Sequence, residues 1–180
     1  MTELMQKLFT VSDAAIRACG LFVPNGDSDP DILSVSIDSR SVRKGDLFIA
    51  LKGEFTDGHN YISMAFKSGA SAVMISDGYY ADNKSEISSP GYPGCLIVVK
   101  DTLLGFHKLA GSWVAGFDGL IRIAVTGSNG KSTTKEMIGA ILSEDGSTII
   151  NEGNLNSETG LPLSVLNIDT HHKYGVFEMG

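Results

Sequence analysis

One stretch of the sequence decides the fold, and it reads Ile121-Arg122-Ile123-Ala124-Val125-Thr126-Gly127-Ser128-Asn129-Gly130-Lys131-Ser132-Thr133-Thr134-Lys135-Glu136-Met137. Its first five residues place apolar side chains at every second position, which is typical of a β-strand. A turn with two glycines follows, and a helix is expected to begin at Lys131. The predicted apolar face of that helix carries Met137, Ile138, Ile141 and Leu142.

The order of strand, glycine-containing turn and helix is the order that a phosphate-binding loop requires. Glycines allow backbone N–H groups to converge on phosphate oxygens, and the helix start adds the positive end of its dipole. Lys131 would reach the β- and γ-phosphates, and the Ser132 hydroxyl can bind Mg²⁺. The sequence therefore predicts a site for a nucleoside triphosphate. Its contacts are expected from Gly127, Ser128, Asn129, Gly130, Lys131, Ser132 and Thr133.

The spacing of this loop differs from the general pattern G-x-x-x-x-G-K-[ST]. Val125 occupies the place of the first glycine, so the loop is the shorter G-x-x-G-K-S-T. An ordinary strand–turn–helix corner with a chance Gly-Lys-Ser is the alternative. The strand before the loop and the helix after it favour phosphate binding.

Composition and charge exclude several classes of protein. The 180 residues include 42% hydrophobic and 19% charged side chains, as in a globular protein, and the net charge of −7 argues against a general nucleic-acid or membrane-surface binder. No apolar run reaches membrane-spanning length, and the first ten residues lack a signal pattern. Cys19 and Cys95 match no metal or redox spacing, so a cytoplasmic protein with free thiols is expected.

The sequence predicts an α/β fold in two domains, 1–100 and 101–180. The first is expected to be a small α/β domain, with 77–94 as an exposed loop rich in Gly, Ser, Pro and Asp. The second is expected to be the start of a P-loop parallel-sheet ATPase domain. Its sheet stops after three strands and leaves an uncovered edge, so we expect the front part of a longer protein. Strands are expected at 34–38, 46–51, 72–75, 96–99, 121–125, 148–151 and 174–180, and helices at 101–116, 131–143 and 162–166.

Several polar residues follow predicted strands, where ligands of open α/β sheets collect. Glu178 can supply a carboxylate to Mg²⁺ held by Ser132 and phosphate, or it can face solvent as an ordinary strand-end residue. Asn154 and Asn156 can donate to phosphate or carboxylate oxygens, although such loops are also common turns. The choice stays open on the residues alone.

Two short motifs of the first domain also follow strands. Ser39 and Arg40 suit binding of a base and of phosphate, and Lys52 follows the next strand. A solvated turn with a salt bridge is the plainer interpretation of the same residues. Asp57-Gly58-His59 fits the start of a helix and is expected to be structural.

Taken together, these motifs resemble the Mur ligase family of peptidoglycan synthesis. Asp38-Ser39-Arg40-x-Val42-x-x-Gly45-Asp46-Leu47-Phe48-x-Ala50-Leu51-x-Gly53 with Asp57-Gly58-His59 is similar to its N-terminal domain, and Thr126-Gly127-x-Asn129-Gly130-Lys131-Ser132-Thr133 to its ATP loop. Gly153-Asn154-Leu155-Asn156, Gly160-x-Pro162 and Phe177-Glu178-x-Gly180 look most like the branch that adds D-alanyl-D-alanine.

The resemblance implies an ATP-dependent amide ligase. It would join D-alanyl-D-alanine to a UDP-N-acetylmuramoyl-tripeptide through an acyl phosphate. Lys131 and Mg²⁺ would then neutralise charge on the transferring phosphoryl group, with Ser132 and Glu178 as the Mg²⁺ ligands. Asn154 would lie beside the nucleotide and the substrate. Domain 1–100 would receive the UDP end of the substrate through Ser39, Arg40 and Lys52.

Family members continue beyond the length of this chain, through the rest of the central domain and a C-terminal domain. A monomer is expected, and the 180 residues alone are expected to be inactive. A Mur ligase that adds another amino acid and a non-catalytic nucleotide- or UDP-sugar-binding module remain alternatives. A general P-loop switch protein would leave Asp38-Ser39-Arg40 and Asp57-Gly58-His59 unexplained.

Overall fold

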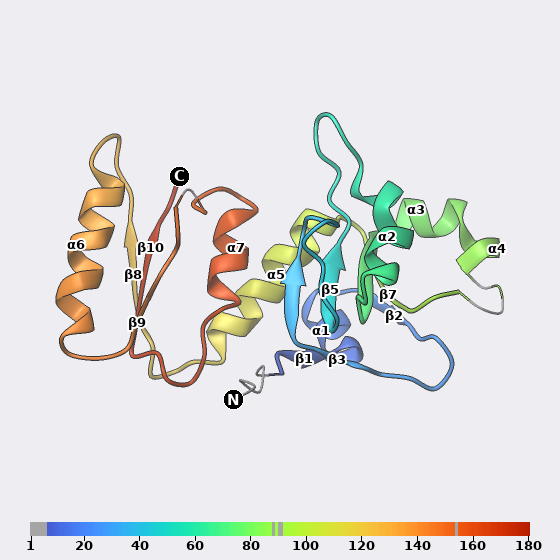
Figure 1. Cartoon of the computed structure of the whole chain (residues 1–180), viewed down its shortest axis with the longest axis horizontal. Coiled ribbons are helices and arrows are strands. Elements are labelled where there is room, and N and C mark those ends of the chain that lie inside the picture. Colours follow the sequence, from blue (N-terminus) through green and yellow to red (C-terminus); the bar gives the residue numbers. More distant parts are fainter. Residues whose placement is uncertain (1–6, 88, 90–91, 154) are drawn as a thin grey trace. The chain divides into compact units, whose positions relative to one another are not determined.

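The computed structural model describes residues 7–87, 89, 92–153 and 155–180 (Figure 1). The chain divides into two compact units, Met1–Leu109 and Ala110–Gly180. Both units are of the α/β class, as the sequence predicts. The domain roles expected from the resemblance, and the expected boundary after residue 100, stay predictions.

The first unit is built on a five-stranded sheet in the order β2-β7-β6-β5-β4. Strands β4, β5, β6 and β7 run parallel, and β2 pairs antiparallel with β7 at the edge. The central strands are continuous apolar runs because both of their faces are covered. A separate ribbon pairs β1 with β3. The bounds are β1 Phe9–Thr10, β2 Leu21–Val23, β3 Asp31–Ile32, β4 Ser34–Ser36, β5 Asp46–Ile49, β6 Ala72–Ser76 and β7 Cys95–Val99.

Helices cover the sheet of the first unit. One core joins Phe48, Val73 and Leu96 of the strands to Ile62 and Ala65 of α2.

The prediction of a loop over 77–94 was wrong in part, because this segment forms α3 and α4. Ser76 starts α3 by accepting a hydrogen bond from the Tyr79 N–H. The bounds are α1 Val11–Arg17, η1 Gly58–Tyr61, α2 Ile62–Lys67, α3 Asp77–Asp82 and α4 Lys84–Ile87. Helix α5, Thr102–Ala115, begins in the first unit and ends in the second.

The second unit holds a three-stranded parallel sheet in the order β8-β10-β9. Its elements are β8 Ile121–Val125, α6 Lys131–Ser143, β9 Thr148–Ile150, α7 Gly160–Val165 and β10 Tyr174–Glu178. Helices α6 and α7 lie on opposite faces of the sheet (Figure 1). Since Glu178 pairs with Val125 in the register, β10 ends beside the start of the loop that is predicted to bind phosphate.

The packing of α6 corrects the predicted apolar face in part, since Ile138 and Leu142 are half-buried as predicted. Met137 and Ile141 are 61% and 69% exposed, whereas Lys135 and Gly139 are buried. A Cβ atom at Gly139 would lie 2.9 Å from Cγ2 of Ile150, so the glycine permits the close approach of helix and sheet. No helix in the described part of the chain combines the length and apolarity needed to span a membrane.

Candidate functional site

The predicted phosphate-binding loop, residues 126–130 (the phosphate loop below), joins β8 to α6 and lies exposed at the carboxyl end of the sheet. Gly130 precedes α6 in the left-handed conformation, with φ of 73°, which a glycine adopts without strain. The first N–H groups of a helix have no intrahelical acceptor, so those of Lys131, Ser132 and Thr133 are available to an anion. The Lys131 ammonium donates to the Gly127 carbonyl at 3.0 Å and therefore lies over the loop. The loop residues predicted from the sequence are thus contiguous around one helix start.

Glu178 meets the same helix start from β10. Its carboxylate accepts hydrogen bonds from the Ser132 hydroxyl at 2.7 Å and from the Asn156 amide at 2.8 Å. The residue is only 4% exposed. Two residues that are far apart in the sequence, both predicted as metal ligands, therefore have their oxygens in direct contact.

The donor set fits Mg²⁺. Hydrogen bonds from Ser132 and Asn156 hold the pKa of the Glu178 carboxyl below its usual value, so Glu178 is ionised at neutral pH. Magnesium takes one or two carboxylates together with hydroxyl, phosphate and water oxygens. The described residues contain no group of three or more His, Cys, Asp or Glu side chains that could hold a metal ion. At this loop Glu178 and Ser132 would supply two oxygens to a metal, and phosphate and water oxygens the others.

The loop after β9 reaches the same place. Asn156, considered in the sequence as a donor to a carboxylate, binds Glu178. Asn154 lies outside the described residues. Sequence reasoning missed two buried residues, Asn151, which hydrogen-bonds Glu178, and Lys135, which hydrogen-bonds Asn151. A lysine one helical turn after Lys131, in a stretch that packs on a sheet, was the available signal.

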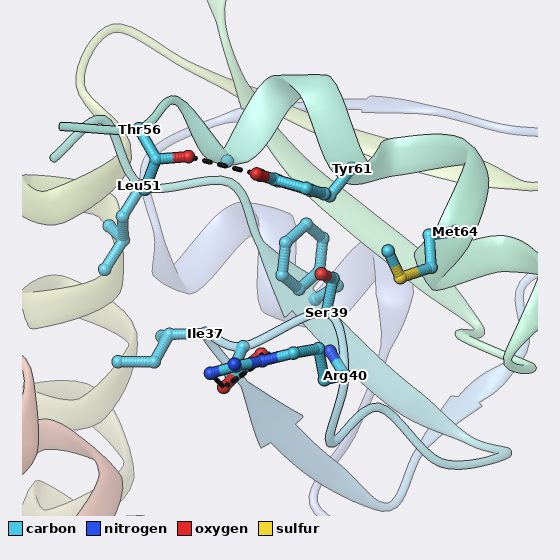
Figure 2. Close-up of a pocket in the computed structure, with 10 residues that line it drawn as sticks. Ile37, Ser39, Arg40, Leu51, Thr56, Tyr61 and Met64 are labelled. Atoms are coloured by element: carbon cyan, nitrogen blue, oxygen red, sulfur yellow. Dashed lines mark hydrogen bonds and ion pairs between the residues drawn. The ribbon is translucent and has the colours of Figure 1, made fainter.

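A pocket of about 530 Å³ opens in the first unit. Figure 2 shows Thr56 and Tyr61 along one edge, Ile37 and Arg40 along the other, and the Ser39 hydroxyl between them. The Thr56 hydroxyl donates to the Tyr61 oxygen at 3.3 Å. The pocket thus combines aromatic and apolar walls with a few polar groups, which suits a planar organic ring. The sequence pointed to Ser39 and Arg40 here but not to Tyr61 or Met64.

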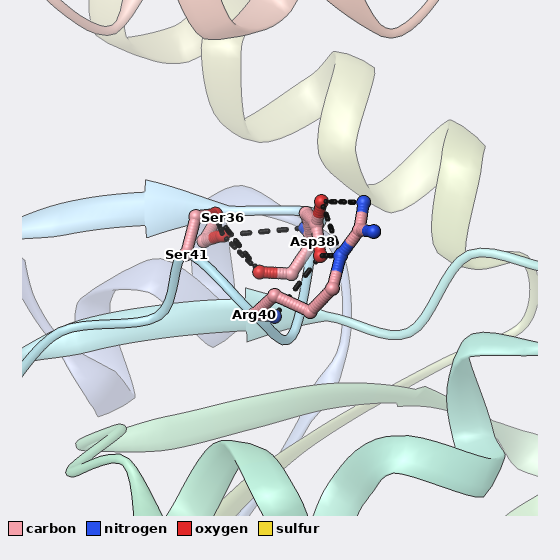
Figure 3. A network of polar contacts seen from close by, with 4 residues as sticks. All are labelled: Ser36, Asp38, Arg40 and Ser41. Carbon is pink, nitrogen blue, oxygen red and sulfur yellow. Dashed lines mark hydrogen bonds and ion pairs between the residues drawn. The ribbon is translucent and has the colours of Figure 1, made fainter.

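The loop after β4 is held by a local polar network (Figure 3). Arg40 donates to both carboxylate oxygens of Asp38, with an Nη2–Oδ2 distance of 2.6 Å. The Arg40 hydrogen bonds lower the pKa of Asp38 to about 2. The Arg40 side chain is nevertheless 83% exposed. Its guanidinium is therefore oriented by Asp38 and still open to a solvent-side anion.

Lys52 does not line this pocket. It lies with Asp57 and His59 in a neighbouring cavity of about 350 Å³. His59 donates through Nδ1 to Asp57 at 2.6 Å, and its Nε2 accepts the Ser76 N–H at 3.0 Å. Both ring nitrogens are engaged, so the histidine ties η1 to the end of β6. This arrangement agrees with the structural role expected for Asp57-Gly58-His59.

Comparison with known proteins identifies two regions that match family models. Residues 31–102 match the Mur ligase family, catalytic domain, and residues 125–180 match the Mur ligase middle domain. The first match contains the pocket with Ser39 and Arg40. The second contains the phosphate loop and Glu178, and the two together cover most of the chain.

Individual relatives agree with these matches. The UDP-N-acetylmuramoyl-tripeptide–D-alanyl-D-alanine ligase of Treponema pallidum is 41% identical over 146 residues, 81% of this chain and 32% of its own length. A crystal structure of MurF from Acinetobacter baumannii superposes with a TM-score of 0.82 at 32% identity, covering 98% of this chain and 36% of that one. The crystal structure of MurF from Thermotoga maritima in complex with ADP superposes with a TM-score of 0.66 at 34% identity, covering 81% of this chain and 31% of that one.

This chain thus spans about a third of the length of the relatives it matches. The shared regions include both of its candidate sites, and the similarity extends through both structural units. The chain belongs to the Mur ligase family.

Proposed function

We propose that this chain forms the substrate-receiving and phosphate-binding parts of an ATP-dependent amide ligase of peptidoglycan precursor synthesis. The enzyme would join D-alanyl-D-alanine to UDP-N-acetylmuramoyl-tripeptide. One observation carries the proposal: the Glu178 carboxylate contacts the Ser132 hydroxyl at 2.7 Å, at the start of the helix that follows a glycine loop. A strand–turn–helix corner that binds no ligand does not require a buried carboxylate beside its serine. The names of the relatives support the choice of substrates.

The proposed reaction has two steps. The terminal carboxylate of the tripeptide attacks the γ-phosphorus of ATP, which gives an acyl phosphate and ADP. The amine of D-alanyl-D-alanine then attacks the acyl carbon, and inorganic phosphate leaves as the amide bond forms. Bound Mg²⁺ would neutralise phosphate charge, held by Ser132 and Glu178. Lys131 would place its ammonium on the β- and γ-phosphates, and the N–H groups at the start of α6 would orient them.

The UDP end of the substrate is assigned to the pocket of the first unit. Ser39 would hydrogen-bond the base, and Arg40, already oriented by Asp38, would meet the diphosphate. Lys52 would act from the neighbouring cavity on the more distant part of the ligand. A location in the cytoplasm and a monomeric state stay predictions.

Glu178→Gln is expected to raise the Mg²⁺ concentration for half-maximal ADP binding by about tenfold, because the amide keeps the shape but loses the charge. Calorimetric titration of ADP into the full-length protein at a series of Mg²⁺ concentrations measures this shift. Glu144→Gln, an exposed change at the end of α6, serves as the control. An unchanged Mg²⁺ dependence in Glu178→Gln would remove Glu178 from the metal site.

Ser39→Ala is expected to weaken binding of the UDP-linked substrate about fivefold, the value of one hydrogen bond of about 1 kcal/mol. ADP affinity should stay at the wild-type value. Fluorescence or calorimetric titration with UDP-N-acetylmuramoyl-tripeptide and with ADP gives both numbers, with the exposed Ser68→Ala as the control. Equal affinities of Ser39→Ala and wild type for the UDP-linked substrate would show that the base does not bind at Ser39.

The reaction itself is tested by phosphate release. The full-length protein is supplied with ATP, Mg²⁺, UDP-N-acetylmuramoyl-tripeptide and one of several amines. Release that depends on D-alanyl-D-alanine supports the proposal. Release with a single amino acid instead would assign another Mur ligase reaction, and no release with any amine would favour a binding module.

A further inference from the structure

Lys135 carries a buried charge that the proposed reaction does not use. Its side chain is 1% exposed, one helical turn beyond Lys131. The ammonium donates to the Asn151 carbonyl at 2.5 Å and lies 3.2 Å from a carboxylate oxygen of the exposed Glu136. Burying an ammonium costs free energy unless its hydrogen bonds are well made. An apolar side chain would fill the same space without that cost, so packing alone does not account for a lysine here.

Asn151 links this ammonium to Glu178. Its side-chain oxygen accepts the Glu178 N–H at 2.8 Å, and its amide donates to the Glu178 carbonyl at 3.1 Å. The same amide donates to the Leu155 carbonyl at 2.8 Å. One fully buried side chain therefore holds both backbone groups of Glu178 and the loop that carries Asn156.

The two ends of this network converge on one carboxylate. Lys135 fixes the backbone of Asn151, Asn151 fixes the backbone of Glu178, and Asn156 binds the Glu178 side chain. The Ser132 hydroxyl completes the set from the helix that also carries Lys135. A shift of β9 or its loop against α6 would therefore move Glu178 away from Ser132.

We propose that Lys135 is a positioning residue, whose buried ammonium fixes Asn151 and thereby sets the Glu178 carboxylate beside Ser132 for binding of Mg²⁺ with the nucleotide. The inference rests on the proposed role of Glu178 as a Mg²⁺ ligand. Lys135 touches neither metal nor phosphate in this role. It acts through the backbone of two neighbouring strands.

Lys135→Met in the full-length protein tests this role, because methionine keeps most of the length of the side chain and removes its charge. The Mg²⁺ concentration for half-maximal ADP binding is expected to rise about tenfold, as for other residues that orient a metal ligand. Calorimetric titration with ADP measures the change without any turnover. Lys108→Met, which replaces an exposed lysine of α5, should leave the Mg²⁺ dependence unchanged.

A double variant shows whether Lys135 acts through Glu178. If it does, Lys135→Met with Glu178→Gln should shift the Mg²⁺ dependence no further than Glu178→Gln alone. Additive shifts would contradict the proposed path. If Lys135→Met is too unstable to purify, Lys135→Arg is titrated instead, and its displaced cation should give a smaller shift in the same direction.

The outcomes separate this inference from the proposed function. A lower melting temperature with a wild-type Mg²⁺ dependence in Lys135→Met would show a lysine that only stabilises the fold, and would overturn the inference. If Glu178→Gln still shifts the Mg²⁺ dependence in that case, the metal site stands. If neither variant shifts it, the metal site itself is wrong.

Discussion

If the proposed function holds, replacing Lys131 with alanine is expected to abolish phosphate release by the full-length protein while its affinity for UDP-N-acetylmuramoyl-tripeptide stays unchanged. The ammonium lies over the loop and donates a hydrogen bond to the Gly127 carbonyl at 3.0 Å. From this position it can donate to a phosphate oxygen instead without a large movement. It is the positive side chain of the predicted phosphate contacts. Loss of one preorganised electrostatic contact to a transition state costs at least about 100-fold in turnover.

The measurement pairs two assays on the same protein. Coupled detection of phosphate gives the turnover rate, and titration with UDP-N-acetylmuramoyl-tripeptide gives the affinity of the first unit. Lys108→Ala is the matched control, since it removes an exposed lysine from another helix. Loss of both functions in Lys131→Ala would contradict the assignment of nucleotide and UDP substrate to separate sites. Wild-type turnover would remove Lys131 from the reaction.

The strand, turn and helix around the predicted phosphate-binding loop could be predicted because their signals are local. The alternating strand, the glycine before the helix and the start of α6 at Lys131 all lie within one short stretch, and α6 ends at Ser143 as predicted. The parallel direction of β8, β9 and β10 follows from the alternation of strands and helices along the chain. Parallel pairing then brings Glu178 to the level of Val125, which explains why a strand-end carboxylate could be proposed as a metal ligand.

The network behind Glu178 could not be predicted because it joins residues from three elements. A lysine and an asparagine in a sequence are most often solvated, and only the packing of α6 on β9 buries Lys135 against the Asn151 carbonyl. The same packing changes the predicted face of α6 in part: Ile138 and Leu142 are half-buried as predicted, but Lys135 and Gly139 replace Met137 and Ile141 on the side that faces the sheet. Periodicity identifies an apolar stripe that faces the core, but it does not show that a buried lysine and a glycine belong to the same side of the helix.

Two residues that line the pocket of the first unit were singled out in the sequence, and their role in binding stays a prediction. Ser39 and Arg40 follow a strand and were visible in the sequence, whereas Tyr61 comes from η1, which begins after a separate turn. The wall that Tyr61 forms depends on how that turn approaches β5. Gly58 controls this approach.

Gly58→Ala is expected to destabilise the first unit by about 3 kcal/mol, the upper part of the usual range for overpacking. A Cβ atom at this position would lie 2.8 Å from both the backbone nitrogen and oxygen of Leu51, and 2.9 Å from the Ala50 carbonyl carbon. These are backbone atoms of the segment that leaves β5, so they cannot rotate away as a side chain would. The Gly58 N–H also donates to the Leu51 carbonyl at 2.8 Å, and separating the two segments would break this hydrogen bond.

Thermal unfolding measures the effect, with a decrease in Tm of about 10 °C expected for that loss of free energy in a protein of this size. Gly78→Ala is the matched control, because a Cβ atom at this position of α3 would meet no described atom beyond its own helix within 4 Å. Alanine also favours a helix, so the Tm of this control should stay equal or rise.

Because Gly58 lines the pocket with Ser39 and Tyr61, Gly58→Ala should also weaken binding of the UDP-linked substrate at temperatures below the Tm. A wild-type Tm in Gly58→Ala would mean that η1 can move away from β5 without a loss of stability. The close approach to Leu51 would then not explain why position 58 carries a glycine.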